Sequence, residues 1–273
     1  MQHDATSSVS RSLAGSELPK LADETKEVGW MQKQAGKYPF EIFGSLLVDG
    51  PFGFGLETQT LPTYGRPFMD RPVNVLNPML THELAHQWYG DSVSPYTWSD
   101  VWRNEGQAAF CELKYADETG GGPDYYGQRT LEDIYQHSDE LRAANRPVAM
   151  PRSSVTVLDV FNENVYDGGA LAFEALRLKV DDTELAEIEK KWPAVYRGRS
   201  ASTDDFIHLA SKISGQNLAS FLTGWLYSTA TPPMPGHPDR TTNRVTAARR
   251  SSIRRHVDRR QCPCNTRPHP HAT

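Results

Sequence analysis

Apolar residues recur at three- and four-residue intervals over most of the chain, a spacing typical of amphipathic helices. In the stretch 18–35, for example, Leu21, Val28 and Met31 stand among charged positions. The same pattern, together with capping and helix-ending residues, predicts further helices. We expect these at residues 77–90, 99–118, 125–144, 163–180, 183–196, 202–213 and 218–227. The chain is therefore predicted to be mostly helical.

Two stretches near the N-terminus have the pattern of strands instead. Residues 45–50 form a short apolar run that ends in a turn. In residues 53–63, one set of alternate positions (Leu56, Thr58 and Thr60) is interleaved with a second set (Glu57, Gln59 and Leu61). Three prolines then make residues 63–73 a loop. We therefore expect an α+β fold with a small β-sheet near the N-terminus and helices towards the C-terminus.

The two ends of the chain differ in composition from the rest. Residues 1–17 are small and polar without periodicity, and we expect them to be disordered. Residues 236–273 form a second segment that we expect to be disordered, because its arginine-rich part has almost no apolar residues. From residue 240 onwards there are nine arginines and one acid, so this part carries +8 and leaves −13 for the preceding residues. An acidic body favours a site for cationic groups, such as a free amino terminus.

Composition also bears on compartment and partners. No stretch approaches the roughly 18 apolar residues of a membrane span, so we expect no membrane partner. Residues 1–12 do not have the pattern of a signal peptide, which predicts a cytoplasmic location if Met1 is the true start and leaves the compartment unknown otherwise. The arginine-rich tail could bind nucleic acid or an anionic surface, but it lacks interleaved aromatic residues, so nucleic-acid binding is the weaker interpretation.

The strongest chemical signal is the sequence His82-Glu83-Leu84-Ala85-His86. Two histidines four residues apart project from one face of a helix, so both imidazoles can reach one zinc ion. Glu83 lies beside them, where its carboxylate could take a proton from water. We expect this helix to begin near Asn77, with Pro78 in its first turn.

A catalytic zinc site typically takes three protein ligands and keeps one position open. Glu105, in the sequence Trp102-Arg103-Asn104-Glu105-Gly106, is the candidate third ligand. On a second helix it could face the two histidines across the helix pair. The two segments together predict a hydrolytic zinc site.

These two segments, the first extended through Gln87-Trp88-Tyr89-Gly90-Asp91, resemble the aminopeptidase N family of gluzincin zinc metallopeptidases, which also contains leukotriene hydrolase. The resemblance covers about residues 18–235. It implies a thermolysin-like catalytic domain at 18–180, a helical extension at 181–235 and one zinc ion per chain. The implied activity is hydrolysis of peptide substrates by water activated at the metal, and the leading interpretation is an aminopeptidase that removes N-terminal residues. The family's zinc ligands fall on His82, His86 and Glu105, and its general base falls on Glu83.

The resemblance implies two further site residues. The family's transition-state tyrosine falls on Tyr166, where a phenol would donate a hydrogen bond to the developing oxyanion. Its amine-binding glutamate falls on Glu57, although only this glutamate matches the family motif Gly-x-Met-Glu-Asn. From helix periodicity, Glu112 shares a face with Glu105 and could hold the second nitrogen of His86; a solvent-facing position fits equally well.

Several departures from the family leave alternatives open. Family members carry a large β-rich domain before the catalytic domain, which we expect to be absent here. An open cleft would favour an endopeptidase over an aminopeptidase, and a catalytically silent remnant is a third alternative. Gln107 stands where the family usually has Phe, at a position expected to be buried, and a buried amide needs partners. Gly168 stands where the family usually has Lys or Arg.

Overall fold

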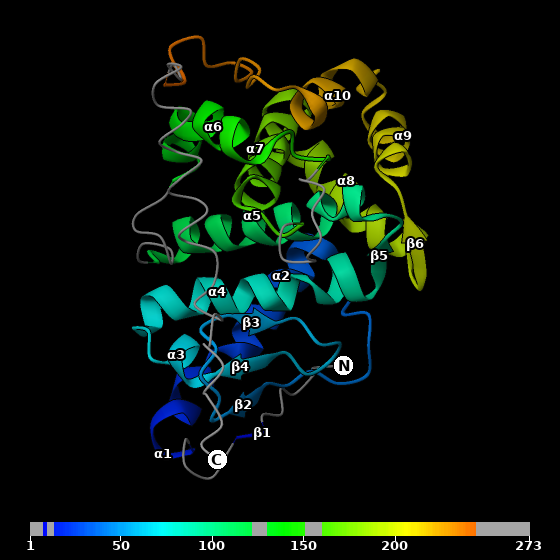
Figure 1. Cartoon of the computed structure of the whole chain (residues 1–273). Helices are drawn as coiled ribbons and strands as arrows, with labels where there is room; N and C mark the ends of the chain where they lie inside the picture. The colour runs from blue at the N-terminus through cyan, green and yellow to red at the C-terminus, as the bar shows by residue number, and fades with distance from the viewer. Residues whose placement is uncertain (1–7, 10–13, 122–129, 151–159, 244–273) are drawn as a thin grey trace, which may run out of the picture.

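The computed structural model describes residues 8–9, 14–121, 130–150 and 160–243, and within this part of the chain the fold is mostly helical, as predicted. A small sheet lies below a stack of helices in Figure 1. The longer helices are α2 (Glu24–Ala35), α4 (Val73–Ala85), α5 (Trp102–Thr119), α6 (Leu131–Asn145), α7 (Glu163–Val180), α8 (Asp182–Tyr196), α9 (Thr203–Ser214) and α10 (Ala219–Tyr227).

The larger sheet consists of four short strands in the order β1-β2-β4-β3. They are β1 (Ser8–Val9), β2 (Leu46–Val48), β3 (Gly55–Leu56) and β4 (Thr63–Gly65). β2 is parallel to both β1 and β4, whereas β3 is antiparallel to β4 and forms an edge of the sheet. The second sheet pairs β5 (Val93–Pro95) with β6 (Arg199–Ala201) in parallel and joins segments that are far apart in sequence.

Short helical turns complete the described part. They are α1 (Ala14–Glu17), the 3₁₀ turn η1 (Leu18–Leu21), α3 (Arg66–Met69), the π-type turn η2 (Gln87–Asp91) and the 3₁₀ turn η3 (Trp98–Asp100). η2 contains a kink, because Tyr89 and Gly90 have non-helical backbone angles. The polypeptide therefore changes direction immediately after the His82–His86 segment.

Helix α4 lies between the sheet and α5 (Figure 1). Its apolar residues Leu76 and Leu80 pack on Leu47 of β2 and Tyr64 of β4 in a small core. Above α4, helix α5 packs against α7, and a larger core extends from there to α8, α9 and α10. Burial of apolar side chains on both sides fixes α4 and α5 against one another, which places the helices that carry the predicted metal ligands side by side.

The sequence-based boundaries hold best for helices with clear capping signals. α7 spans the predicted residues 163–180, and α9 begins at the predicted capping box of Ser202 and Asp205. α5 ends at Gly120, whose left-handed backbone suits a residue without a Cβ. Residues 122–129, at the predicted start of α6, lie outside the described residues.

Four other predictions were wrong in detail. The metal helix begins at Val73 and not at Asn77, and Pro78 lies inside it. Residues 53–63 are not one strand, because Thr60 has a left-handed backbone with φ of 64° that ends the alternation. Residues 63–73 contain β4 and α3 and are not a plain loop. Residues 18–35 divide into η1 and α2.

The structure describes only part of the two chain ends, so only part of what we predicted for them is tested. Ser8–Val9 forms a strand and Ala14–Glu17 a helix, within the segment that we expected to be disordered. Residues 244–273, most of the arginine-rich tail, lie outside the described residues. The domain boundaries stay predictions. Among the described residues, no helix combines the length and the apolar character needed to cross a membrane.

Candidate metal centre

The two histidines lie at the end of α4. His82 is in the last turn of the helix and His86 follows as its C-terminal cap. Their rings are 5.0 Å apart between centroids and inclined by 71°. His86 is almost completely buried, with 2% of its side chain exposed, and His82 retains 12%. The four-residue spacing therefore brings both imidazoles to one face, as the sequence predicts.

Helix α5 brings Glu105 to the same point. Its Oε2 atom lies 3.6 Å from His82 Nε2 and 3.4 Å from His86 Nε2. One ligand atom from each of the three side chains lies within 4.8 Å of the others. Two imidazole nitrogens and one carboxylate oxygen are the ligands that zinc prefers in hydrolytic sites. The residues thus fit a zinc ion both in their chemistry and in their separation.

The second nitrogen of each imidazole also has a partner. His82 Nδ1 lies 3.0 Å from Glu112 Oε2, and His86 Nδ1 lies 3.3 Å from the carbonyl oxygen of Tyr89. Glu112 therefore contacts His82 and not His86, the ring that we considered from periodicity. Contacts of this kind orient an imidazole so that its other nitrogen can bind a metal.

Electrostatic interactions favour charge on all three side chains. Burial raises the pKa of Glu105, but the adjacent His86 and His82 outweigh it and lower the pKa to about 2. Burial lowers the pKa of His86, but the charge of Glu105 outweighs it and raises the pKa to about 9. Burial also lowers the pKa of His82, but its hydrogen bonds to Glu105 and Glu112 outweigh this effect and raise the pKa well above its usual value.

Glu83 is buried beside this cluster, with 8% exposed. Burial raises its pKa to about 7, although the two histidines oppose this shift. The backbone of β3 packs directly on its carboxylate, since a Cβ on Gly55 would clash with Glu83 Oε1. Glu83 is therefore held between the metal helix and the edge strand of the sheet.

Tyr166 lies in the first turns of α7 and stacks near His82, with ring centroids 6.1 Å apart and an interplanar angle of 25°. A close crossing of α7 and α5 brings it there. A Cβ on Gly169 would lie 2.6 Å from the Cα of Gly106, so the crossing requires glycine on both helices. Gly168 is confined as well, because its Cβ would lie 2.7 Å from Val148 Cγ2. This contact explains why the long side chain usual in the family has no room.

Glu57 follows edge strand β3 and is half-buried. Its negative charge acts on Glu83 and on His86, raising the pKa of both. The described structure therefore brings all six predicted site residues into one region: a tight cluster of His82, His86 and Glu105, with Glu83, Tyr166 and Glu57 around it.

Helices α5 and α8 share a buried polar network, of which the sequence predicted only the burial of Gln107. Gln107 is fully buried, as expected, and its amide donates to Glu189 Oε1 at 2.7 Å and accepts from Arg103 Nη1 at 3.1 Å. Burial lowers the pKa of the Arg103 guanidinium to about 10. The guanidinium carbon lies 4.7–5.0 Å from four ring centroids, those of Tyr89, Phe173, Trp192 and Phe206.

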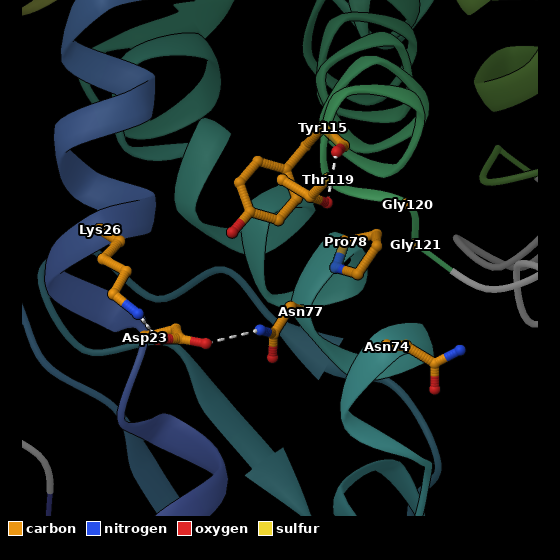
Figure 2. A pocket seen from close by; sticks show the side chains of 9 residues that line it. All are labelled: Asp23, Lys26, Asn74, Asn77, Pro78, Tyr115, Thr119, Gly120 and Gly121. Atoms are coloured by element: carbon orange, nitrogen blue, oxygen red, sulfur yellow. Dashed lines mark hydrogen bonds and ion pairs between the residues drawn. The ribbon is translucent and has the colours of Figure 1, made fainter.

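A separate pocket of about 290 Å³ lies farther along the two helices (Figure 2). It is lined by residues such as Asp23 at the N-cap of α2, Asn77 and Pro78 of α4, and Tyr115 of α5, and it contains none of the six predicted site residues. Asp23 is already paired with Lys26 at 2.5 Å and accepts from Asn77 at 3.3 Å. We therefore base the chemistry on the histidine–carboxylate cluster and not on this pocket.

Comparison with known proteins agrees with the geometry. The chain is 26% identical over 149 residues to glutamyl aminopeptidase of Rattus norvegicus, covering 54% of this chain and 16% of that protein. It is 28% identical over 169 residues to aminopeptidase N of Lactobacillus helveticus, covering 59% and 19%. A mutant M1 zinc metallopeptidase of Deinococcus radiodurans, solved bound to Tyr-Ser-Ala substrate, superposes with a TM-score of 0.64 at 29% identity, covering 78% and 46%.

The chain thus spans less than a fifth of the two curated relatives and about half of the solved one. The family model described as "Peptidase family M1 domain" matches residues 70–225. This match covers more than half of the chain and includes both segments that supply the three candidate metal ligands. The resemblance that we inferred from the two motifs is confirmed. The chain belongs to peptidase family M1.

Proposed function

We propose that this chain is the zinc-dependent catalytic part of an aminopeptidase, which removes residues from the amino ends of peptides. The observation that carries the proposal is the convergence of His82, His86 and Glu105 within 4.8 Å, with the buried carboxyl group of Glu83 beside them. The relatives named as aminopeptidases and the tripeptide held by the Deinococcus enzyme support the substrate class.

His82 Nε2, His86 Nε2 and Glu105 Oε2 would hold one zinc ion. Zinc in such a site supplies a Lewis acid that polarises a carbonyl group and lowers the pKa of water to about 7. Glu112 and the Tyr89 carbonyl would keep the two imidazole rings oriented.

Glu83 is the proposed general base. Its carboxylate would accept a proton from the attacking water and donate it to the nitrogen of the leaving amine. Tyr166 would donate its phenolic hydrogen to the oxyanion that develops on the substrate carbonyl, an interaction typically worth about 3 kcal/mol.

Glu57 is the proposed contact for the substrate's free amine. A half-buried carboxylate at the edge of the cluster favours an ammonium group over an acylated nitrogen, because the latter carries no charge. This residue would make the enzyme cut from the amino end. The endopeptidase alternative predicts no such preference.

The test is hydrolysis of an aminoacyl p-nitroanilide by the zinc-loaded chain and by Glu83→Gln. We expect the variant to lose at least about 100-fold in kcat, since general-base catalysis contributes that much, while it keeps stoichiometric zinc. Glu187→Gln, the same change on the exposed face of α8, is the matched control and should behave as wild type. An inactive wild-type chain that still binds zinc would support the silent remnant and contradict the proposal.

Exopeptidase specificity is tested with an acetyl-blocked peptide of the same sequence. We expect cleavage of the free-amine peptide only, and we expect Glu57→Gln to raise KM for it. Equal cleavage of both peptides would contradict the role of Glu57 and favour the endopeptidase.

A further inference from the structure

The side chain of Gln87, the residue after His86, is fully buried and uses both of its polar atoms. Its Oε1 accepts hydrogen bonds from the backbone N–H of Thr60 at 2.7 Å and from the Tyr38 hydroxyl at 3.1 Å. Its Nε2 donates to Asp91 Oδ2 at 2.8 Å and lies 3.5 Å from the carbonyl oxygen of Glu57. One amide thus connects the metal segment to the loop that contains Glu57.

Only one orientation of this amide satisfies the contacts. A flipped amide would place its NH₂ against the N–H of Thr60 and its oxygen against the carboxylate of Asp91, so that two donors and two acceptors would face one another. Asp91 therefore fixes the direction of the amide and directs Oε1 of Gln87 towards Thr60.

The loop needs an external partner. It connects β3 to β4, and internal hydrogen bonds run from Thr58 N to the Leu56 carbonyl and from Leu61 N to the Thr58 carbonyl. Thr60 has φ of 64°, a conformation that β-branched residues rarely adopt unless their surroundings impose it. Its N–H is held by Gln87, and its carbonyl accepts from Gly44 N at 3.0 Å.

We propose that Gln87 is a positioning residue that fixes the Glu57 loop relative to the metal cluster. Because Gln87 is adjacent in sequence to His86, its amide transmits the position of the metal helix to Thr60 and to the backbone of Glu57. A loop fixed in this way holds the carboxylate of Glu57 at one distance from the reacting centre. The inference rests on the proposed amine-binding role of Glu57.

The proposal is tested with Gln87→Met, which keeps the length of the side chain and removes its hydrogen bonds. With the zinc-loaded full chain, we expect KM for a free-amine aminoacyl p-nitroanilide to rise about 10-fold while kcat changes less than about 3-fold. Bound zinc should remain at the wild-type level. Tyr38→Phe removes a contact to the same Oε1 without touching the loop, and its KM should stay at the wild-type value.

A double-mutant cycle separates positioning from general packing. If Gln87 acts by placing Glu57, then Gln87→Met should add less than about 2-fold to KM in a Glu57→Gln background. The same rise in both backgrounds, or an equal rise in Tyr38→Phe, would overturn the proposal. So would a loss of kcat and zinc together, since that would be the result of a merely structural role.

Hydrogen exchange gives a readout that does not depend on activity. In Gln87→Met, the Thr60 amide should lose protection while amides in the middle of α4 keep theirs. Unchanged protection of Thr60 would overturn the proposal even in an active enzyme. A wild-type chain without activity would refute the proposed function alone, and the exchange experiment would still decide whether Gln87 holds the loop.

Discussion

The contact between Gly106 and Gly169 gives a prediction that can be worked out from the structure. A Cβ on Gly169 would lie 2.6 Å from the Cα of Gly106 and 3.3 Å from the carbonyl oxygen of Trp102. Ordinary contact begins at 3.4 Å, so Gly169→Ala must move α7 away from α5 by about 1 Å. Overpacking of this kind costs about 1–3 kcal/mol, whereas alanine gains at most about 1 kcal/mol in helix propensity.

The expected net effect is a loss of about 1–2 kcal/mol in the free energy of unfolding, measured by urea denaturation followed by tryptophan fluorescence. Zinc affinity should fall too, because Gly106 directly follows Glu105 and the shift would move this ligand. Calorimetric titration of the metal-free protein with zinc measures that loss.

Gly29→Ala is the matched control. Gly29 lies inside α2 with no atom within 4 Å of an added Cβ, so the same substitution should stabilise the protein by about 0.5–1 kcal/mol and leave zinc affinity unchanged. If Gly169→Ala were as stable as wild type with the same zinc affinity, the close helix crossing would not be what positions Glu105.

Two further predictions concern buried polar groups, and a third concerns a strained backbone position. Glu189→Leu should destabilise the protein by about 3 kcal/mol because it removes the acceptor of the Gln107 amide and the negative charge that acts on the buried Arg103. The triple variant with Arg103→Leu and Gln107→Phe should recover to within about 1 kcal/mol of wild type in urea unfolding. Burial, with repulsion from neighbouring acids, raises the pKa of Glu27 well above 4.5, so the folded state binds its proton more tightly and loses stability as pH rises through that pKa. Glu27→Gln should therefore be more stable than wild type at pH 8, and the difference should disappear near pH 4; an unchanged difference would contradict the assignment. Thr60→Gly should raise the melting temperature, since relief of the left-handed strain is worth about 1 kcal/mol.

The three candidate metal ligands could be identified from the sequence because the patterns that indicate them are local. The spacing of His82 and His86 depends only on the helical repeat, and Glu105 lies in a segment that is helical by periodicity. The same reasoning could show that Glu112 shares the face of Glu105, but not which histidine it contacts. That choice depends on how far α5 slides along α4, which is set by packing with residues from the rest of the core.

The predictions that were wrong involve residues that act against their local preference. Thr60 adopts a left-handed backbone under a β-branched side chain, so the alternating pattern around it suggested a strand where the chain turns. Pro78 lies inside α4 although proline usually marks a first turn. The burial of Gln107 was predicted correctly, but its partner Glu189 could not be, because it is far away in sequence and cannot be inferred from spacing.

The most direct test of the account is anomalous diffraction at the zinc edge from crystals of the metal-loaded chain, together with zinc analysis in solution. We expect one zinc ion per chain, bound by His82 Nε2, His86 Nε2 and a Glu105 oxygen, and a loss of stoichiometric zinc in Glu105→Ala. A chain that takes up no stoichiometric zinc, or that binds it at other residues, would contradict the account.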